Sequence, residues 1–303
     1  TPLRRPSRNI RVCAAQWQMR RIRTWEEFEN IVDFFVDVAD AYHCHFLLFP
    51  EYFTAQLFST MNENLSEKQL VDQLVSFNDK YLEMFRKKAQ KKNIYIIGGS
   101  TPVKREGILF NVAHLFTPSG NVYTQDKLHI TPTERSEWGV RPGQDINIFE
   151  TPYGRIAIQI CYDIEFPEVS RILTLAGAEV IFVPFTTDDK DAYYRVRYTA
   201  QARAIENFVY VAIAGNVGTL PTTKNYLINY GQAAIFSASV FCFQPKAIAG
   251  EADPNTETVV ISDLDLNLLA HAREIGSVRP LHHRRPDLYE LKSLVSPNII
   301  KVE

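Results

Sequence analysis

Apolar runs and amphipathic segments alternate along the first third of the chain. Runs with the length of buried strands occupy residues 10–17, 46–50 and 94–98. Between them, apolar residues recur every three or four positions, which predicts helices over residues 25–42 and 67–91. This alternation of strand and helix is typical of an α/β protein.

Strand-like runs become more frequent in the middle of the chain, where turn residues separate them. They occupy residues 109–116, 122–124, 146–149 and 156–161, and two last strands are predicted at 232–243 and 257–264. Two further runs, 179–184 and 208–214, each follow a predicted helix, over 169–176 and 192–207. This distribution predicts two sheets with helices on their outer sides.

Three residues with reactive side chains stand at the ends of strand-like runs. Glu51 follows one run, Lys127 stands between two, and Cys161 ends another. In an α/β protein such ends gather at one edge of a sheet, where active sites form. Pro167 opens the next predicted helix, and a thiol near a helix N-terminus is favoured as the nucleophilic thiolate. The alternative is that Cys161 is a small buried core residue.

The residues around these three positions resemble the Glu, Lys and Cys motifs of the nitrilase superfamily, the carbon–nitrogen hydrolases, in the same order along the chain. The matching segments are Phe49-Pro-Glu51-Tyr52, Lys127-Leu-His129 with Pro132-Thr-Glu134, and Cys161-Tyr-Asp-Ile-Glu-Phe-Pro-Glu168. The resemblance covers most of the chain and implies a four-layer α-β-β-α sandwich. We therefore expect an N-terminal extension over residues 1–9, a hydrolase domain over 10–270 and an irregular C-terminal tail over 271–303 that contacts another subunit.

The resemblance also implies a role for each motif residue. Cys161 is expected to be the nucleophile, Glu51 the proton shuttle and Lys127 the donor that holds the oxyanion, with the backbone N–H of Tyr162 as a second donor. Glu134 matches a second glutamate that orients the lysine or the substrate amide. Glu137 is the alternative for that position, and either could be a solvated loop carboxylate. Because the Glu51 carboxylate raises the thiol pKa and the ammonium lowers it, the residues are expected to titrate as one cluster.

Further residues are candidates for the pocket or for structural roles. Phe185 and Thr186 lie in a loop that lines the pocket in this superfamily, and Tyr52 and Trp138 are candidate aromatic walls that could equally be core residues. Acidic residues in and after the Cys161 turn, Asp163, Glu165 and Glu168, are expected to complement the helix dipole. Arg203 and Glu206 are spaced for an exposed helical ion pair.

The dipeptide that follows the nucleophile, Tyr162-Asp163, is typical of superfamily members that cleave amides or carbamoyl groups. The resemblance thus implies a thiol amidohydrolase that cleaves a small linear amide or N-carbamoyl compound through a Cys thioester and releases ammonia or an amine. Two alternatives stay open: a true nitrilase, and a catalytically silent interaction module.

The composition and charge of the chain argue against several classes of binding partner. A hydrophobic content of 46% and a charged content of 22% are those of a soluble globular protein. The net charge of −2 and the lack of a long Lys/Arg run argue against nucleic acid, and no apolar run approaches about 18 residues, which argues against a membrane span. His43, Cys44 and His45 alternate across a strand and cannot converge on a metal.

We therefore expect a small-molecule amide as the partner, with no metal and no cofactor. Four cysteines show no disulfide spacing, and a nucleophilic thiol suits a reducing compartment, so the cytoplasm is predicted. The resemblance implies a homodimer or a higher homo-oligomer.

Overall fold

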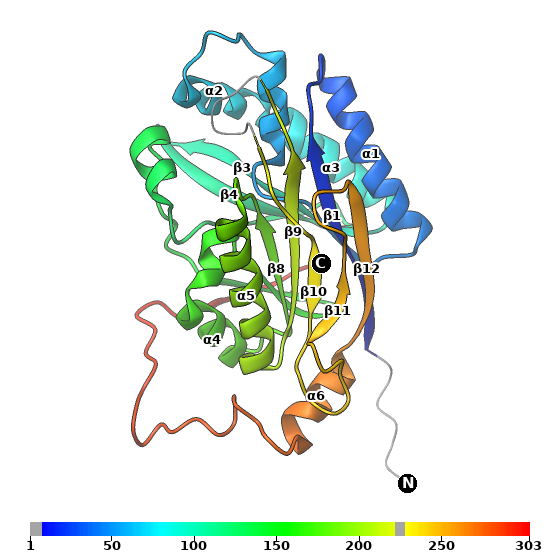
Figure 1. The fold of residues 1–303 in the computed structure, drawn as a ribbon, viewed down its shortest axis with the longest axis vertical. Helices are drawn as coiled ribbons and strands as arrows, with labels where there is room; N and C mark the ends of the chain where they lie inside the picture. The colour runs from blue at the N-terminus through cyan, green and yellow to red at the C-terminus, as the bar shows by residue number, and fades with distance from the viewer. Residues whose placement is uncertain (1–7, 222–227) are drawn as a thin grey trace.

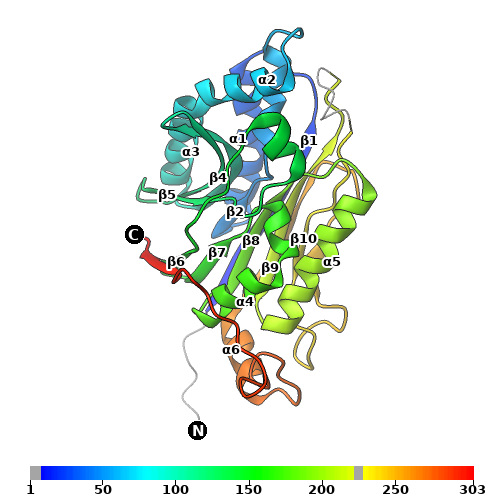
Figure 2. The ribbon, with the colours of Figure 1, turned by 90° about the vertical axis from the view of Figure 1, so that its left-hand side faces the viewer.

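Two helical layers enclose the strands (Figures 1 and 2). The computed structural model describes residues 8–221 and 228–303. Helices α1 (Trp25–Ala41) and α3 (Asn78–Lys92) cover one side of the strands, and α4 (Pro167–Leu175) and α5 (Lys190–Asn207) cover the other. The predicted α-β-β-α layering is confirmed.

The strands form one continuous hydrogen-bonded sheet that curls over itself. Its main path runs β13-β6-β7-β8-β9-β1-β2-β3-β4-β5, with β10, β11 and β12 attached at β9 and β1. The strands are β1 (Asn9–Met19), β2 (Phe46–Leu48), β3 (Tyr95–Arg105), β4 (Ile108–Phe116), β5 (Val122–Asp126), β6 (Asn147–Thr151), β7 (Gly154–Ile158), β8 (Val180–Phe185), β9 (Tyr210–Gly218), β10 (Ala234–Phe236), β11 (Ile248–Glu251), β12 (Thr258–Asp265) and β13 (Asn298–Lys301). The two predicted sheets are thus two halves of one sheet, joined where β1 pairs in parallel with β9.

Successive side chains of β1 point to opposite faces of the sheet and belong to two different hydrophobic cores. Val12 and Ala14 face the interior between the two halves of the sheet, where strands from both halves supply buried side chains. Phe46 of β2 and Phe182 of β8 meet there, with ring centroids 5.5 Å apart. Trp17, on the other face of β1, belongs to the core under α1 and α3.

Helix α1 forms where the apolar periodicity predicts it. The Thr24 side chain caps the helix by accepting a hydrogen bond from the Glu27 N–H. The buried face of α1 includes Phe28 and Phe35, and the Phe35 ring stacks on Trp17 at 5.4 Å. The periodic face therefore covers one side of the sheet, as amphipathic helices do.

Two predicted elements have different bounds. The helix predicted over 67–91 is divided into α2 (Glu67–Leu74) and α3 by a 3₁₀ turn, η2 (Val75–Phe77). Ser76 in this turn donates to the Gln73 carbonyl, a local bond that competes with the helical ladder. The strand predicted at 94–98 continues to Arg105, because a register shift lets the chain pass Gly99, whose φ is +65°.

The C-terminal third departs most from the prediction. The strand predicted over 232–243 is reduced to β10, and β11 was not predicted. Helix α6 (Leu266–Ile275) crosses the predicted boundary at residue 270, so the tail is not irregular from its start. Asp265 caps this helix, while Leu266 and Leu269 are buried. Residues 276–297 then run past α4 to β13, which pairs with β6 (Figure 2). Of the extension predicted over residues 1–9, residues 1–7 lie outside the described part of the chain.

Candidate active site

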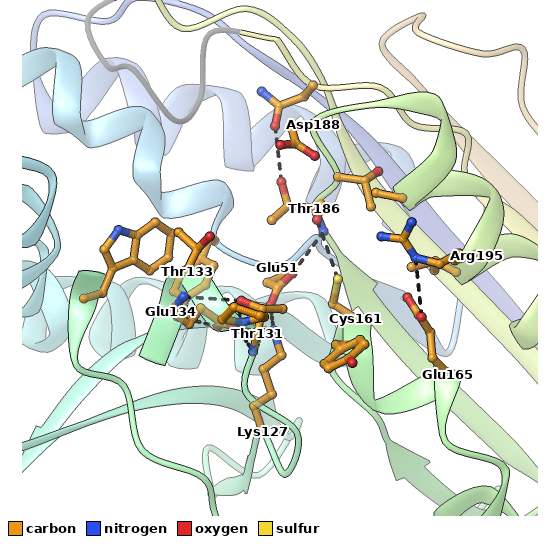
Figure 3. A pocket seen from close by; sticks show the side chains of 18 of the residues that line it. Glu51, Lys127, Thr131, Thr133, Glu134, Cys161, Glu165, Thr186, Asp188 and Arg195 are labelled. Carbon is orange, nitrogen blue, oxygen red and sulfur yellow. Dashed lines mark hydrogen bonds and ion pairs between the residues drawn. The ribbon is translucent and has the colours of Figure 1, made fainter. Parts of the chain in front are cut away.

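The predicted reactive residues meet in one cavity of about 800 Å³ (Figure 3). Glu51 lies beyond the end of β2, Lys127 directly after β5, and Cys161 beyond the end of β7. All three are buried, with Glu51 and Lys127 only 1% and 2% exposed. The structure thus brings together the side chains that the sequence placed at strand ends, while their catalytic roles stay predictions.

Cys161 occupies an unusual backbone conformation. Its φ is +49°, in the left-handed region that residues other than glycine rarely adopt. Such a conformation costs on the order of 1 kcal/mol and persists only where neighbouring contacts enforce it. Cys161 begins a 3₁₀ turn, η4 (Cys161–Glu165), and α4 begins only at Pro167. The thiol therefore does not sit at the N-terminus of α4, contrary to the sequence prediction.

Arg203 of α5 holds this turn from the outside. Its guanidinium donates to the Ile164 carbonyl at 3.1 Å and to the Glu165 carbonyl at 3.0 Å. Arg203 is buried, although it also pairs with Glu206 at 3.2 Å. The prediction of an exposed helical ion pair is therefore wrong, because the side chain turns inward to satisfy carbonyls of the turn.

Asp163 connects the Cys161 turn to the Lys127 loop. Its carboxylate accepts hydrogen bonds from the Ile160 N–H at 3.0 Å and the His129 N–H at 2.7 Å. It also bonds to His129 Nδ1 at 2.9 Å, and it is fully buried. The expected interaction with the helix dipole is thus not its main role, because the carboxylate bridges two segments that carry reactive residues.

Lys127 lies between two carboxylates. Its Nζ is 2.8 Å from Glu51 Oε1 and 2.7 Å from Glu134 Oε2. Burial acts to lower the pKa of Lys127, but Glu134 and Glu51 outweigh it and hold that pKa well above its usual value. Glu137 is exposed, so Glu134 and not Glu137 is the glutamate that contacts Lys127, while its orienting role stays a prediction.

The pKa values of the two carboxylates are shifted in opposite directions. Burial raises the pKa of Glu51, and the charge of Glu134 adds to this while Lys127 opposes it. For Glu134, burial acts in the same sense, but Lys127 and hydrogen bonds from Asn111 and Thr131 outweigh it and lower its pKa. Glu51 is therefore the more readily protonated of the pair and the better proton acceptor at neutral pH.

Cys161 is held as a neutral thiol at rest. Burial raises its pKa well above the usual thiol value, and the charge of Glu51 raises it further, with Lys127 opposing. Thr186 links the two residues, since its N–H donates to Glu51 Oε2 at 3.1 Å and its carbonyl accepts from Cys161 Sγ at 3.6 Å. The thiol therefore needs a base at the moment of attack.

Most of the predicted pocket residues line the cavity. Tyr52, Trp138, Tyr162 and Thr186 are all part of its wall. The Tyr52 hydroxyl donates to Glu134 Oε1 at 3.1 Å, and the Tyr52 and Trp138 rings meet edge to face at 5.5 Å. These aromatic residues therefore form the wall of the cavity beside Glu134.

Phe185 is the exception, because it does not line the cavity. It is fully buried, and its ring fills the space next to Gly215, where a Cβ would lie 2.1 Å from the ring. The ring also packs on Tyr193 at 6.0 Å. The prediction that Phe185 forms a pocket wall is wrong because the side chain points into the core.

Several polar residues of the site were not predicted. Asn111 Nδ2 donates to both Glu51 Oε1 and Glu134 Oε1, each at 2.9 Å. Asn216 Nδ2 donates to the Glu51 backbone carbonyl at 2.7 Å. The one signal in the sequence is that both asparagines interrupt or follow apolar strands, where a buried amide requires a polar partner.

Residues 8–221 and 228–303 contain no group of three or more His, Cys, Asp or Glu side chains placed to hold a metal ion. Within the same residues, no helix has both the length and the apolar character needed to cross a membrane.

The chain is similar to known hydrolases in sequence. It is 47% identical over 283 residues to a probable hydrolase, YhcX, of Bacillus subtilis (strain 168), a match that covers 93% of this chain and 55% of that protein. The chain thus spans about half the length of this relative. It is also 31% identical over 214 residues to the omega-amidase NIT2 of Xenopus tropicalis, covering 67% of this chain and 72% of that protein.

Solved structures share the fold. The C. elegans NitFhit protein matches with a TM-score of 0.77 and 24% identity, over 93% of this chain and 66% of that one. An amidase from Nesterenkonia sp. matches with a TM-score of 0.67 and 20% identity, over 95% of this chain and 97% of that one. The family model described as carbon-nitrogen hydrolase matches residues 11–274. The chain therefore belongs to the carbon–nitrogen hydrolase family, with the fold of the nitrilase superfamily.

Proposed function

We propose that this chain hydrolyses the C–N bond of a small linear amide or N-carbamoyl compound through a thioester on Cys161. The observation that carries the proposal is the convergence of a buried thiol, a carboxylate of raised pKa and an ammonium in one cavity. The similarity to a protein named omega-amidase supports amide hydrolysis as the reaction class.

The first half-reaction begins with proton transfer from the thiol to Glu51. As the proton moves, Cys161 Sγ forms a bond to the carbonyl carbon and the carbonyl oxygen becomes an oxyanion. When the tetrahedral intermediate collapses, the C–N bond breaks and Glu51 gives the proton to the departing nitrogen, so that ammonia or an amine leaves. A thioester stays on Cys161.

The second half-reaction consumes water. Glu51, again ionised, accepts a proton from a water molecule that attacks the thioester carbon. The C–S bond then breaks, the thiolate recovers the proton and the acid product leaves. Both halves need a base whose pKa lies nearer neutrality than that of an ordinary carboxylate, which agrees with the raised pKa of Glu51.

Lys127 is suited to hold the oxyanion. An ammonium group has three donors, and two of them are directed at Glu51 and Glu134. The third is then available for the negative oxygen that develops in the transition state. A positioned cation of this kind in a buried site stabilises the transition state more than the substrate.

The test is ammonia release by the purified protein from short amides, ω-amides of dicarboxylates, N-carbamoyl amines and nitriles, with products identified by mass spectrometry. Cys161→Ala should abolish release at retained fold, while Cys242→Ala, at an exposed cysteine, should leave it unchanged. Turnover of nitriles alone would favour a nitrilase. Undiminished release in Cys161→Ala would overturn the proposal.

A further inference from the structure

We propose that the substrate carries a protonated amine at the end remote from the scissile amide, and that Glu165 is the carboxylate that recognises it. This inference rests on the proposed function, since it names the class of amide or carbamoyl compound that the same cavity accepts. Glu165 lies in the wall of the cavity beyond the reacting residues.

Glu165 is fixed relative to the nucleophile. It ends the 3₁₀ turn that begins at Cys161, lines the same cavity, and its side chain is only 18% exposed. Its backbone carbonyl is held by Arg203, which also holds the preceding residue. A group bound to Glu165 is therefore placed at a defined distance from the thiol.

The described residues that line the cavity carry an excess of negative charge. Four carboxylates, Glu51, Glu134, Glu165 and Asp188, face two cations, Lys127 and Arg195, so the net charge is −2 when all six are ionised. A cavity whose lining has an excess of one sign of charge concentrates ligands of the opposite sign. An ammonium end group is thus attracted, and a carboxylate end group is repelled.

Arg195 of α5 does not neutralise Glu165 effectively. Their ion pair joins Nε to Oε2 at 3.6 Å, longer than the 2.7–2.9 Å typical of a charge-assisted hydrogen bond. The Arg195 side chain is 60% exposed, so most of it is in solvent. Figure 3 shows the pair at one side of Cys161. A substrate ammonium can replace Arg195 at Glu165 while Arg195 moves into water.

Partial burial of Glu165 strengthens its interaction with a cation that binds close to it. Burial raises the pKa of Glu165, and Arg195, Arg203 and Lys127 together offset this effect only in part. A carboxylate that has lost part of its hydration gains more from a close cation than an exposed one does. Asp188 is exposed at the same cavity and adds negative charge without being shielded in this way.

The first test compares three amides of similar length: 5-aminopentanamide, hexanamide and glutarate monoamide. The kcat/KM is expected to fall in the order cationic, neutral, anionic. Glu165→Gln should lower the value for the cationic amide roughly tenfold and leave the neutral amide within about twofold. The matched control is Glu168→Gln, which removes the same charge from an exposed residue outside the cavity and should leave the order unchanged. A preference for the anionic amide, lost in Arg195→Gln, would overturn the inference.

A second test needs no turnover. Cationic and anionic methanethiosulfonate reagents of matched size label Cys161, and each rate is divided by the rate with glutathione. The cationic reagent should be favoured, and Glu165→Gln but not Glu168→Gln should reduce that preference. Equal labelling by both reagents would contradict the inference. If no amide is hydrolysed but the cationic reagent still labels Cys161 faster, the result would count against the proposed function and not against the charge selectivity of the cavity.

Discussion

Asp163→Asn is expected to weaken both the fold and the reaction. The carboxylate accepts hydrogen bonds from the backbone N–H groups of His129 at 2.7 Å, of Leu128 at 3.2 Å and of Ile160 at 3.0 Å. An asparagine keeps the shape but has only one acceptor oxygen. Its NH₂ group must then face an N–H donor in a fully buried position.

The expected loss of stability and activity in Asp163→Asn follows from these hydrogen bonds. A hydrogen bond to a charged group contributes about 1.5–3 kcal/mol, and a buried donor left without an acceptor adds a desolvation cost of similar size. We expect the free energy of unfolding to fall by about 3 kcal/mol. Asp163 connects the Lys127 loop to the Cys161 turn, so its loss is expected to change the position of Lys127 relative to Cys161. A shift of about 1 Å would lower kcat/KM by roughly 100-fold.

The assay is urea unfolding followed by tryptophan fluorescence, together with ammonia release under native conditions. The matched control is Asp263→Asn, which removes the same charge from a side chain that is 60% exposed and paired with Arg11. A surface pair of this kind contributes about 0–1 kcal/mol. If the two variants lost equal stability and Asp163→Asn kept full activity, the reasoning about the buried carboxylate would be refuted.

Three further predictions concern two residues that contact Glu51 or Lys127, namely Asn111 and Glu134, and the buried residue His114. Asn111→Leu removes the amide that donates to Glu51 and Glu134 at 2.9 Å, so kcat/KM should fall by about 100-fold, and a loss below fivefold would contradict a positioning role. Glu134 raises the pKa of Glu51, so Glu134→Gln should move the acid limb of the kcat/KM profile to lower pH, and a shift to higher pH would contradict this. Burial lowers the pKa of His114 to about 3, below its usual 6.5, so its neutral ring contributes stability that is full above pH 6.5 and is lost as the pH falls from 6.5 towards 3. Between pH 7 and 4.5 the wild type should therefore lose about 3 kcal/mol more than His114→Phe in urea unfolding, and equal losses would refute the assignment.

The reactive residues could be predicted because each is polar and ends or follows an apolar run. Glu51, Lys127 and Cys161 each interrupt the hydrophobic pattern at a point where a strand must end. The strands β2, β1, β9, β8 and β7 pair in parallel, so Glu51 and Cys161 follow strands that end at the same side of the sheet. β5, which precedes Lys127, runs in the same direction, because it is antiparallel to β4 and β4 is antiparallel to β3, the parallel neighbour of β2. The motif order and the strand ends together were sufficient to predict the cluster.

The orientation of the side chains at the end of β8 and directly after it could not be predicted from the same pattern. Every residue of β8 is buried, so apolar and polar positions do not alternate and either neighbour could face the cavity. The structure directs Phe185 to Gly215, which is distant in sequence, and leaves Thr186 at the cavity. The choice depends on a tertiary contact and not on local sequence.

The supporting polar residues depend on contacts between distant segments. Asp163 bonds to Leu128 and His129, and Asn111 bonds to two glutamates on other elements. Nothing in the local sequence of Asp163 distinguishes a buried bridge from an acidic residue near a helix N-terminus. Helix α6 was missed for a related reason, since its cap, Asp265, is also the last residue of β12.

The thioester on Cys161 can be observed in the mass of the protein during turnover. The enzyme is mixed with an amide that it hydrolyses, quenched in acid within milliseconds, digested and analysed by mass spectrometry. An acyl group is expected on the peptide that contains Cys161, and it should be absent from Glu51→Gln, which lacks the base that accepts the thiol proton. Steady ammonia release with Cys161 unmodified at every time point, and unchanged in Cys161→Ala, would contradict the account.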